Sequence, residues 1–210
     1  MEFGIAAKLF AALFAIMNPL TNLPVFLSLT QERSPGERNA IALTGAATTF
    51  VILCVTLFTG SRVLDFFGIT VDDFRIAGGL LILLMALSML HVQPSRVHHA
   101  SEESDEGREK DNPGVFPLAM PLLAGPGSIT TVIVFAEQAH GFTGRAVSAA
   151  VIFVLCAMIY VTFALGSRIA GVLGATGMNI MTRIMGMLLA AIAVGMLVDG
   201  LAGAFPALKG

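Results

Sequence analysis

The chain has 210 residues, of which 56% are hydrophobic and 12% are charged. Soluble domains carry roughly 25% charged residues, so this composition excludes an ordinary soluble domain, and the net charge of −2 gives no reason to expect nucleic-acid binding. The two cysteines, Cys54 and Cys156, both lie in apolar runs and therefore indicate neither a disulfide framework nor a metal site.

Six long, almost uncharged stretches alternate with short charged segments. Each is longer than the roughly 18 apolar residues that mark a membrane-spanning helix. We therefore expect an all-α membrane protein with six transmembrane helices, located in the cell inner (plasma) membrane. The first stretch has no small-residue cleavage motif, which favours a retained helix over a signal peptide. The stretches are residues 9–31, 39–61, 76–95, 112–136, 146–167 and 184 to the C-terminus.

The first stretch carries an interruption signal in its C-terminal half. Pro19 and Pro24 each lack a backbone donor and clash with the preceding helical turn. Asn18, Thr21 and Asn22 lie beside them, and such residues are poor helix formers that can bond to freed backbone groups. The sequence predicts that the first transmembrane helix is discontinuous here.

The segment after the third stretch is acidic and polar. Residues 93–113 include the runs SEESDE and REKD, a composition that cannot bury enough apolar surface to fold alone. We predict a solvated linker loop at 93–113, between a first unit of residues 1–92 and a second unit of residues 114–210.

The fourth stretch contains a second interruption signal. Residues 125–127 read Gly-Pro-Gly inside an apolar run, and Pro121 precedes them. Such a run is a strong helix break. Irregular backbone within a bilayer is tolerated only where it lines a cavity inside the protein. The fourth helix is therefore also predicted to be discontinuous, with its break facing the protein interior.

Short motifs of the first half recur in the same order in the second half. Each half holds three predicted spans, and an odd number makes the second half enter the membrane from the opposite face. The predicted architecture is two inverted three-helix repeats, as in many secondary transporters. The matched motifs begin at residues 19 and 121 (offset 102), 55 and 161 (offset 106), 68 and 174 (offset 106), and 75 and 183 (offset 108).

Paired across the axis of such a repeat, the two interruptions predict one central binding site. The N-terminus of a half-helix offers N–H groups to a carboxylate, and its C-terminus offers carbonyl groups to an ammonium group. The spans hold almost no ionisable residue, which favours a small substrate that is neutral overall, carried by alternating access. The candidate substrate-binding residues are Asn18, Pro19, Thr21, Asn22, Pro24, Pro121, Gly125, Pro126, Gly127, Ser128 and Thr130.

Other interpretations of these features stay open. The prolines are compatible with kinks tolerated for packing, and carbonyl groups at the breaks also suit a cation in an ion channel or exchanger. Asp199, in the last span, is either a proton-linked residue or a residue that marks the helix end. No nucleophile–base pair, metal-ligand cluster or phosphate loop is visible in the sequence, so we expect no catalytic activity, cofactor or metal.

Lysine and arginine residues predict the orientation in the membrane. If the N-terminus lies outside, the cytoplasmic loops hold seven of these residues and the outer side holds five. Because cytoplasmic loops are enriched in positive charge, this distribution favours an external N-terminus.

The two interruption segments resemble those of the MarC family. They are residues 17–26, MNPLTNLPVF, and residues 117–130, PLAMPLLAGPGSIT, and the similarity extends over nearly the whole chain. The resemblance implies a six-helix bacterial or archaeal membrane protein that transports neutral amino acids such as glycine and alanine, driven by a proton gradient. It also implies a substrate bound at the two breaks. Many relatives have glycine where this chain has Thr21, so we expect a narrower site here.

Overall fold

The computed structural model describes residues 2–90, 112–139 and 141–205, and every element in these ranges is helical. Five helical segments there are long and apolar enough to cross a membrane, and the bent pair η2–α5 makes a sixth if it is counted as one span. The all-helical membrane fold is thus confirmed, whereas most of the predicted 93–113 loop lies outside the described residues. In chain order the elements are α1 (Glu2–Met17), α2 (Pro19–Leu29), α3 (Pro35–Phe67), α4 (Val71–Leu90), the π-helix η2 (Gly114–Leu123), α5 (Pro126–Gln138), α6 (Gly141–Ala164) and α7 (Gly166–Ala204).

Local sequence signals set the boundaries of α3 and α4. Ser34 and Glu37 form a capping box at the start of α3, where each side chain accepts the backbone N–H of the other residue. The helix ends at Gly68, whose φ of 69° lies in the left-handed region that glycine adopts without a steric penalty. Thr70 and Asp73 then exchange the same type of reciprocal bonds at the start of α4.

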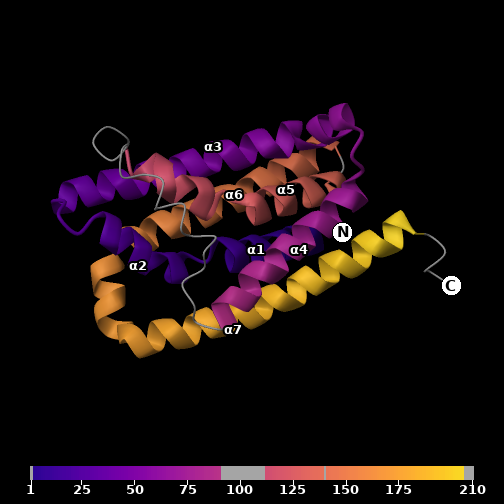
Figure 1. Cartoon of the computed structure of the whole chain (residues 1–210). Helices are drawn as coiled ribbons and strands as arrows, with labels where there is room; N and C mark the ends of the chain where they lie inside the picture. The colour runs from indigo at the N-terminus through magenta and orange to yellow at the C-terminus, as the bar shows by residue number, and fades with distance from the viewer. Residues whose placement is uncertain (1, 91–111, 140, 206–210) are drawn as a thin grey trace.

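The first span, formed by α1 and α2, lies at the centre of the molecule (Figure 1). In its most apolar window 61% of the residues are buried, against 22–39% in the other four single-helix spans. Around it, α3 packs along α6 and α4 packs along α7. The outer faces of these helices expose large apolar side chains such as Val55, Leu84 and Phe153. Extended apolar surface of this kind is what a lipid bilayer covers.

The packing pattern is nearly unchanged when the first three spans are exchanged for the last three. In the first half, α3 contacts η2 and α5, and its counterpart α6 in the second half contacts α1 and α2. Likewise α4 contacts α5, and its counterpart α7 contacts α1 and α2. Two close approaches also match at an offset of 106 residues. A Cβ added at Gly60 would lie 2.5 Å from Ile133, and one at Gly166 would lie 2.7 Å from Leu23 and 3.5 Å from Leu27.

The last span is longer than the sequence predicted. α7 turns at Gly174 (φ 60°, ψ −179°) before it runs beside α4 (Figure 1), and the candidate span covers Thr176–Ala204. The prediction that this span begins at residue 184 is wrong, because Arg183 is exposed and its charge does not interrupt the helical backbone. Gly68 and Gly174 both have positive φ and occupy matching positions in the two halves, 106 residues apart.

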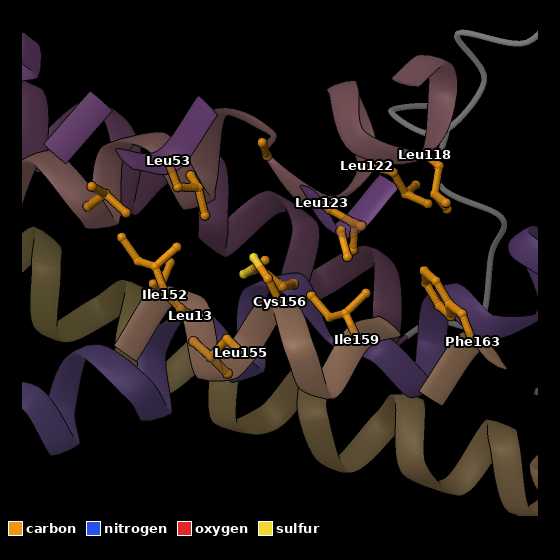
Figure 2. Close-up of a cluster of buried hydrophobic side chains, with 14 of the residues drawn as sticks. Leu13, Leu53, Leu118, Leu122, Leu123, Ile152, Leu155, Cys156, Ile159 and Phe163 are labelled. Carbon is orange, nitrogen blue, oxygen red and sulfur yellow. The ribbon is translucent and has the colours of Figure 1, made fainter. Parts of the chain in front are cut away.

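The core that surrounds the first span is apolar. Figure 2 shows side chains of η2, including Leu118 and Leu123, pointing toward Ile159 and Phe163 of α6. Phe163 also stacks on Phe26 of α2, with ring centroids 4.6 Å apart and ring planes 5° apart. Because both rings are almost completely buried, this stack fastens α2 to the second half of the chain.

Candidate functional site

The first interruption lies at a single residue. α1 ends at Met17 and α2 begins at Pro19, whose missing N–H costs nothing at the first position of a helix. Asn18 joins them with a φ of 29°, a positive value that asparagine tolerates better than most residues. Its side-chain Oδ1 accepts the backbone N–H of Thr21 at 3.2 Å and so caps α2.

The other end of the Asn18 amide has no partner. The residue is 3% exposed, and its Nδ2 makes no hydrogen bond within the described part of the chain. Only an oxygen can accept the Thr21 N–H, so the capping bond fixes the orientation of the amide and leaves the NH2 group free. An unpaired buried donor costs about 1–3 kcal/mol. This atom is therefore the strongest indication of a ligand group in the described structure.

Pro24 does not contribute to this break. It lies inside α2, which continues to Leu29, and its side chain is exposed. The prediction that Pro24 interrupts the span is therefore wrong, while its place in a binding site stays a prediction. The physical reason is that a proline removes one intrahelical bond, and the flanking turns of α2 bridge this loss without a sharp bend.

The second interruption lies between η2 and α5, which meet at an angle of 60°. Leu123 ends η2, Ala124 is non-helical, and Gly125 precedes the first residue of α5, Pro126. Gly125 has no room for a side chain, because a Cβ there would collide with the carbonyl oxygen of Pro121. The prediction placed Pro121 in the break. It lies within the bounds of η2 but directly follows Met120, whose φ of −129° and ψ of 125° are not helical, so the backbone is irregular at Pro121 as well.

Asn22 and Ser128 stabilise the two breaks by hydrogen bonds of the same type. Asn22 Nδ2 donates to the carbonyl oxygen of Met17 at 2.7 Å, and Ser128 Oγ donates to that of Leu123 at 2.7 Å. Each bond reaches back five residues to the last residue of the preceding helix. These two bonds match at an offset of 106 residues, whereas the non-helical residues directly before Pro19 and Pro121, Asn18 and Met120, match at the 102 predicted from the proline spacing.

The structure brings the two breaks together in the interior. A Cβ added at Gly127 would lie 3.3 Å from Ile16 at the end of α1 and 3.1 Å from Ile82 of α4. Met17 and Leu123, the last residues before the two breaks, belong to the same cluster of buried side chains. The end of α1 and the start of α5 are therefore in contact in the core.

Four other predicted residues differ in their burial and in the elements they contact. Pro19 is buried, and Pro126 is exposed at the start of α5. Thr130 is buried against Gly78 of α4, where an added Cβ would collide with the threonine side chain. Asp199 is exposed on α7, and the neighbouring Gly200 packs on the first turns of α4, so the structure does not place Asp199 beside the breaks.

Sequence reasoning missed three threonines. Thr182 of α7 lies with its Oγ1 3.4 Å from the Oγ1 of Thr21. Thr49 and Thr131 are fully buried, and their hydroxyl groups have no partner within the described ranges. No sequence signal distinguished them, because a threonine in an apolar run usually bonds to its own helix, as Thr56 does to the carbonyl oxygen four residues earlier.

The long apolar helices and their lipid-compatible outer faces define a multi-pass integral membrane protein. The model of the MarC family, described as MarC family integral membrane proteins, matches residues 3–205. The chain therefore belongs to this family, and the resemblance identified from the sequence is confirmed.

Relatives from distant organisms match over nearly their full length. The chain is 38% identical to the UPF0056 membrane protein YhcE of Escherichia coli, covering 99% of this chain and 96% of that protein. It is 39% identical to YvbG of Bacillus subtilis, covering 99% of each. It is 37% identical to MJ1677 of the archaeon Methanocaldococcus jannaschii, covering 93% of this chain and 95% of that protein. No solved structure matches the chain.

Proposed function

We propose that the protein is a secondary transporter of small neutral amino acids of the glycine and alanine class, which bind between the two interrupted helices. In this proposal it works by alternating access in the inner membrane, is coupled to protons and has its N-terminus outside. The observation that carries the proposal is the buried, unpaired NH2 group of Asn18 at the N-terminus of α2.

The start of α2 suits a carboxylate. A helix N-terminus has a partial positive charge of roughly +0.5. Backbone donors contribute little at the start of α2, because Pro19 has no N–H and those of Thr21 and Asn22 bond to Asn18. The Asn18 Nδ2 adds a side-chain donor at the same place, and no competing acceptor occupies it among the described residues. A carboxylate bound there would satisfy the donor and interact favourably with the helix dipole.

The surroundings of the breaks suit a ligand without net charge. The buried polar side chains of the described ranges are amides and hydroxyls only, on Asn18, Asn22 and a group of threonines and serines. A ligand with net charge would lack a counter-charge in this region, and burying an unpaired charge is very costly. A zwitterion carries its own counter-charge, and its ammonium group suits the carbonyl groups that end α1 and η2.

The correspondence of the two halves supports alternating access. The bonds of Asn22 and Ser128 and the close contacts of Gly60 and Gly166 recur at one offset of 106 residues. An odd number of spans per half makes such a repeat inverted, and transporters with inverted repeats move one repeat against the other around a central site. Proton coupling rests on the family resemblance alone.

The test is uptake of radiolabelled glycine and alanine by proteoliposomes, with and without imposed proton and sodium gradients. Asn18→Asp keeps an oxygen for the Thr21 N–H but removes the free donor. We expect it to lower saturable uptake at least about tenfold, since a hydrogen bond to a charged group contributes about 1.5–3 kcal/mol. Ser148→Ala is the control, because Ser148 is equally buried but bonds within α6.

Two outcomes contradict the proposal. Unchanged glycine and alanine uptake in Asn18→Asp would show that the substrate does not bind at the break between α1 and α2. If liposomes with the wild-type protein conduct ions and amino acids do not compete with this conductance, the protein is instead an ion channel or exchanger. Accessibility of a tag at the N-terminus to an impermeant reagent in intact cells tests the orientation.

A further inference from the structure

Thr182 of α7 contacts the first break from the opposite half of the chain. Its Oγ1 donates a hydrogen bond to the carbonyl oxygen of Met178 at 2.9 Å and lies 3.4 Å from the Oγ1 of Thr21. A hydroxyl group has one proton, and that of Thr182 is used within α7. Thr182 therefore accepts in its contact with Thr21, and Thr21 donates.

This contact determines what Thr21 can offer to a ligand. Once the Thr21 proton is directed to Thr182, its hydroxyl oxygen keeps only acceptor capacity. Three residues earlier the opposite holds for Asn18, whose Oδ1 is occupied by the Thr21 N–H and whose Nδ2 remains a donor. The first turn of α2 therefore offers a ligand one free donor group, Asn18 Nδ2, and one free acceptor, Thr21 Oγ1. Asn18 is held in this orientation by its bond to the Thr21 N–H, and Thr21 by its bond to Thr182.

We propose that Thr182 is a positioning residue that holds the Thr21 hydroxyl as an acceptor toward a donor group of the ligand, such as an ammonium group. This inference rests on the proposed function and deepens it by naming a residue of α7 that sets ligand preference at the break in the other half. The bond joins α2 to α7, so the fixed polarity exists only while these two helices are together.

The experiment compares Thr182→Val and Thr182→Ser in the proteoliposome assay. Valine has nearly the shape of threonine but cannot accept from Thr21, whereas serine keeps both bonds. We expect Thr182→Val to raise the KM for glycine about tenfold with little change in kcat, and to reduce the preference for glycine over acetate as a competitor, because acetate lacks the ammonium group. Thr182→Ser restores wild-type values. Thr162→Val is the control, since Thr162 makes the same type of bond to its own helix, α6, but this bond is exposed.

A double-mutant cycle with Thr21→Val tests whether the effect passes through Thr21. If it does, Thr21→Val with Thr182→Val is no worse than Thr21→Val alone. Equal selectivity in Thr182→Val and wild type overturns the inference, as does an equal loss of glycine and acetate binding that serine does not restore. Absence of saturable glycine uptake in the wild type overturns the proposed function and this inference with it. The outcomes named before it overturn the inference alone, so the two failures can be told apart.

Discussion

Asn22 and Ser128, from different halves of the chain, donate hydrogen bonds of the same length to the carbonyl oxygen five residues earlier. Both bonds are buried, and both acceptors end the helix that precedes a break. Both side chains are among the substrate-binding residues predicted from the sequence. Each of them, however, donates a hydrogen bond to a carbonyl oxygen at its own break. This assigns both a structural part there and leaves the NH2 group of Asn18 as the buried donor group without a partner among these three side chains.

Removal of either bond is expected to destabilise the protein. Asn22→Ala and Ser128→Ala each leave a buried carbonyl oxygen without this donor, at a cost of about 1–3 kcal/mol. Thermal unfolding in detergent measures the effect, and Thr162→Val provides a comparison with an exposed hydroxyl. Unfolding midpoints equal to wild type in both variants would contradict the role described for these bonds.

The positive φ of Asn18 predicts an order of stability among its variants. Alanine at φ 29° pays a steric penalty of roughly 1–2 kcal/mol that glycine avoids, and both lose the cap of α2. Asn18→Gly is therefore expected to unfold at a higher temperature than Asn18→Ala, although neither supports uptake. Equal stabilities of the two variants would show that the backbone relaxes at this residue.

The contact between Gly78 and Thr130 leaves no space for a methyl group. Gly78→Ala is expected to destabilise the protein by about 1–3 kcal/mol, because an added Cβ collides with Thr130. Combination with Thr130→Ala should recover part of this loss, since the closest atom is the threonine Cγ2. Gly36→Ala is the matched control, as nothing lies within 4 Å of its added Cβ. Thermal unfolding of the four proteins checks the prediction.

Arg38 holds the turn between α2 and α3. Its Nε donates to the carbonyl oxygens of Thr30 and Arg33 at 3.0 and 3.1 Å, and its Nη2 donates to that of Gln31 at 3.0 Å. A lysine ammonium group cannot span these acceptors as a guanidinium does. Arg38→Lys is therefore expected to accelerate proteolysis at residues 30–34, measured by mass spectrometry of the fragments.

The matched control for this prediction is Arg62→Lys, at an exposed position of α3. Cleavage of Arg38→Lys at the wild-type rate would show that the three bonds do not limit opening of the turn. The guanidinium also donates to Ser167 Oγ at 3.4 Å, so Ser167→Ala separates the bond between the two halves from the bonds within the turn.

Much of the fold followed from local features of the sequence. The long uncharged stretches predicted the spans, and the Gly-Pro-Gly run at residues 125–127 predicted the second break, which lies at Gly125. The prediction was less accurate for Pro24, which lies inside α2, whereas Pro121 directly follows the non-helical Met120. Proline weakens a helix wherever it occurs, but the surrounding contacts decide whether the helix bends there.

By itself the sequence determined that this protein is helical, lies in a membrane and belongs to the MarC family, because hydrophobic length and short motifs are properties of local segments. Only the tertiary structure decided which polar atoms remain available at the breaks. Asn22 and Ser128 each donate to a carbonyl oxygen at a break, the NH2 group of Asn18 has no partner, and Thr21 is directed by Thr182 from 161 residues away. Hydrogen bonding saturates, so the free capacity of a group depends on all its neighbours in space, and a sequence lists only its neighbours along the chain.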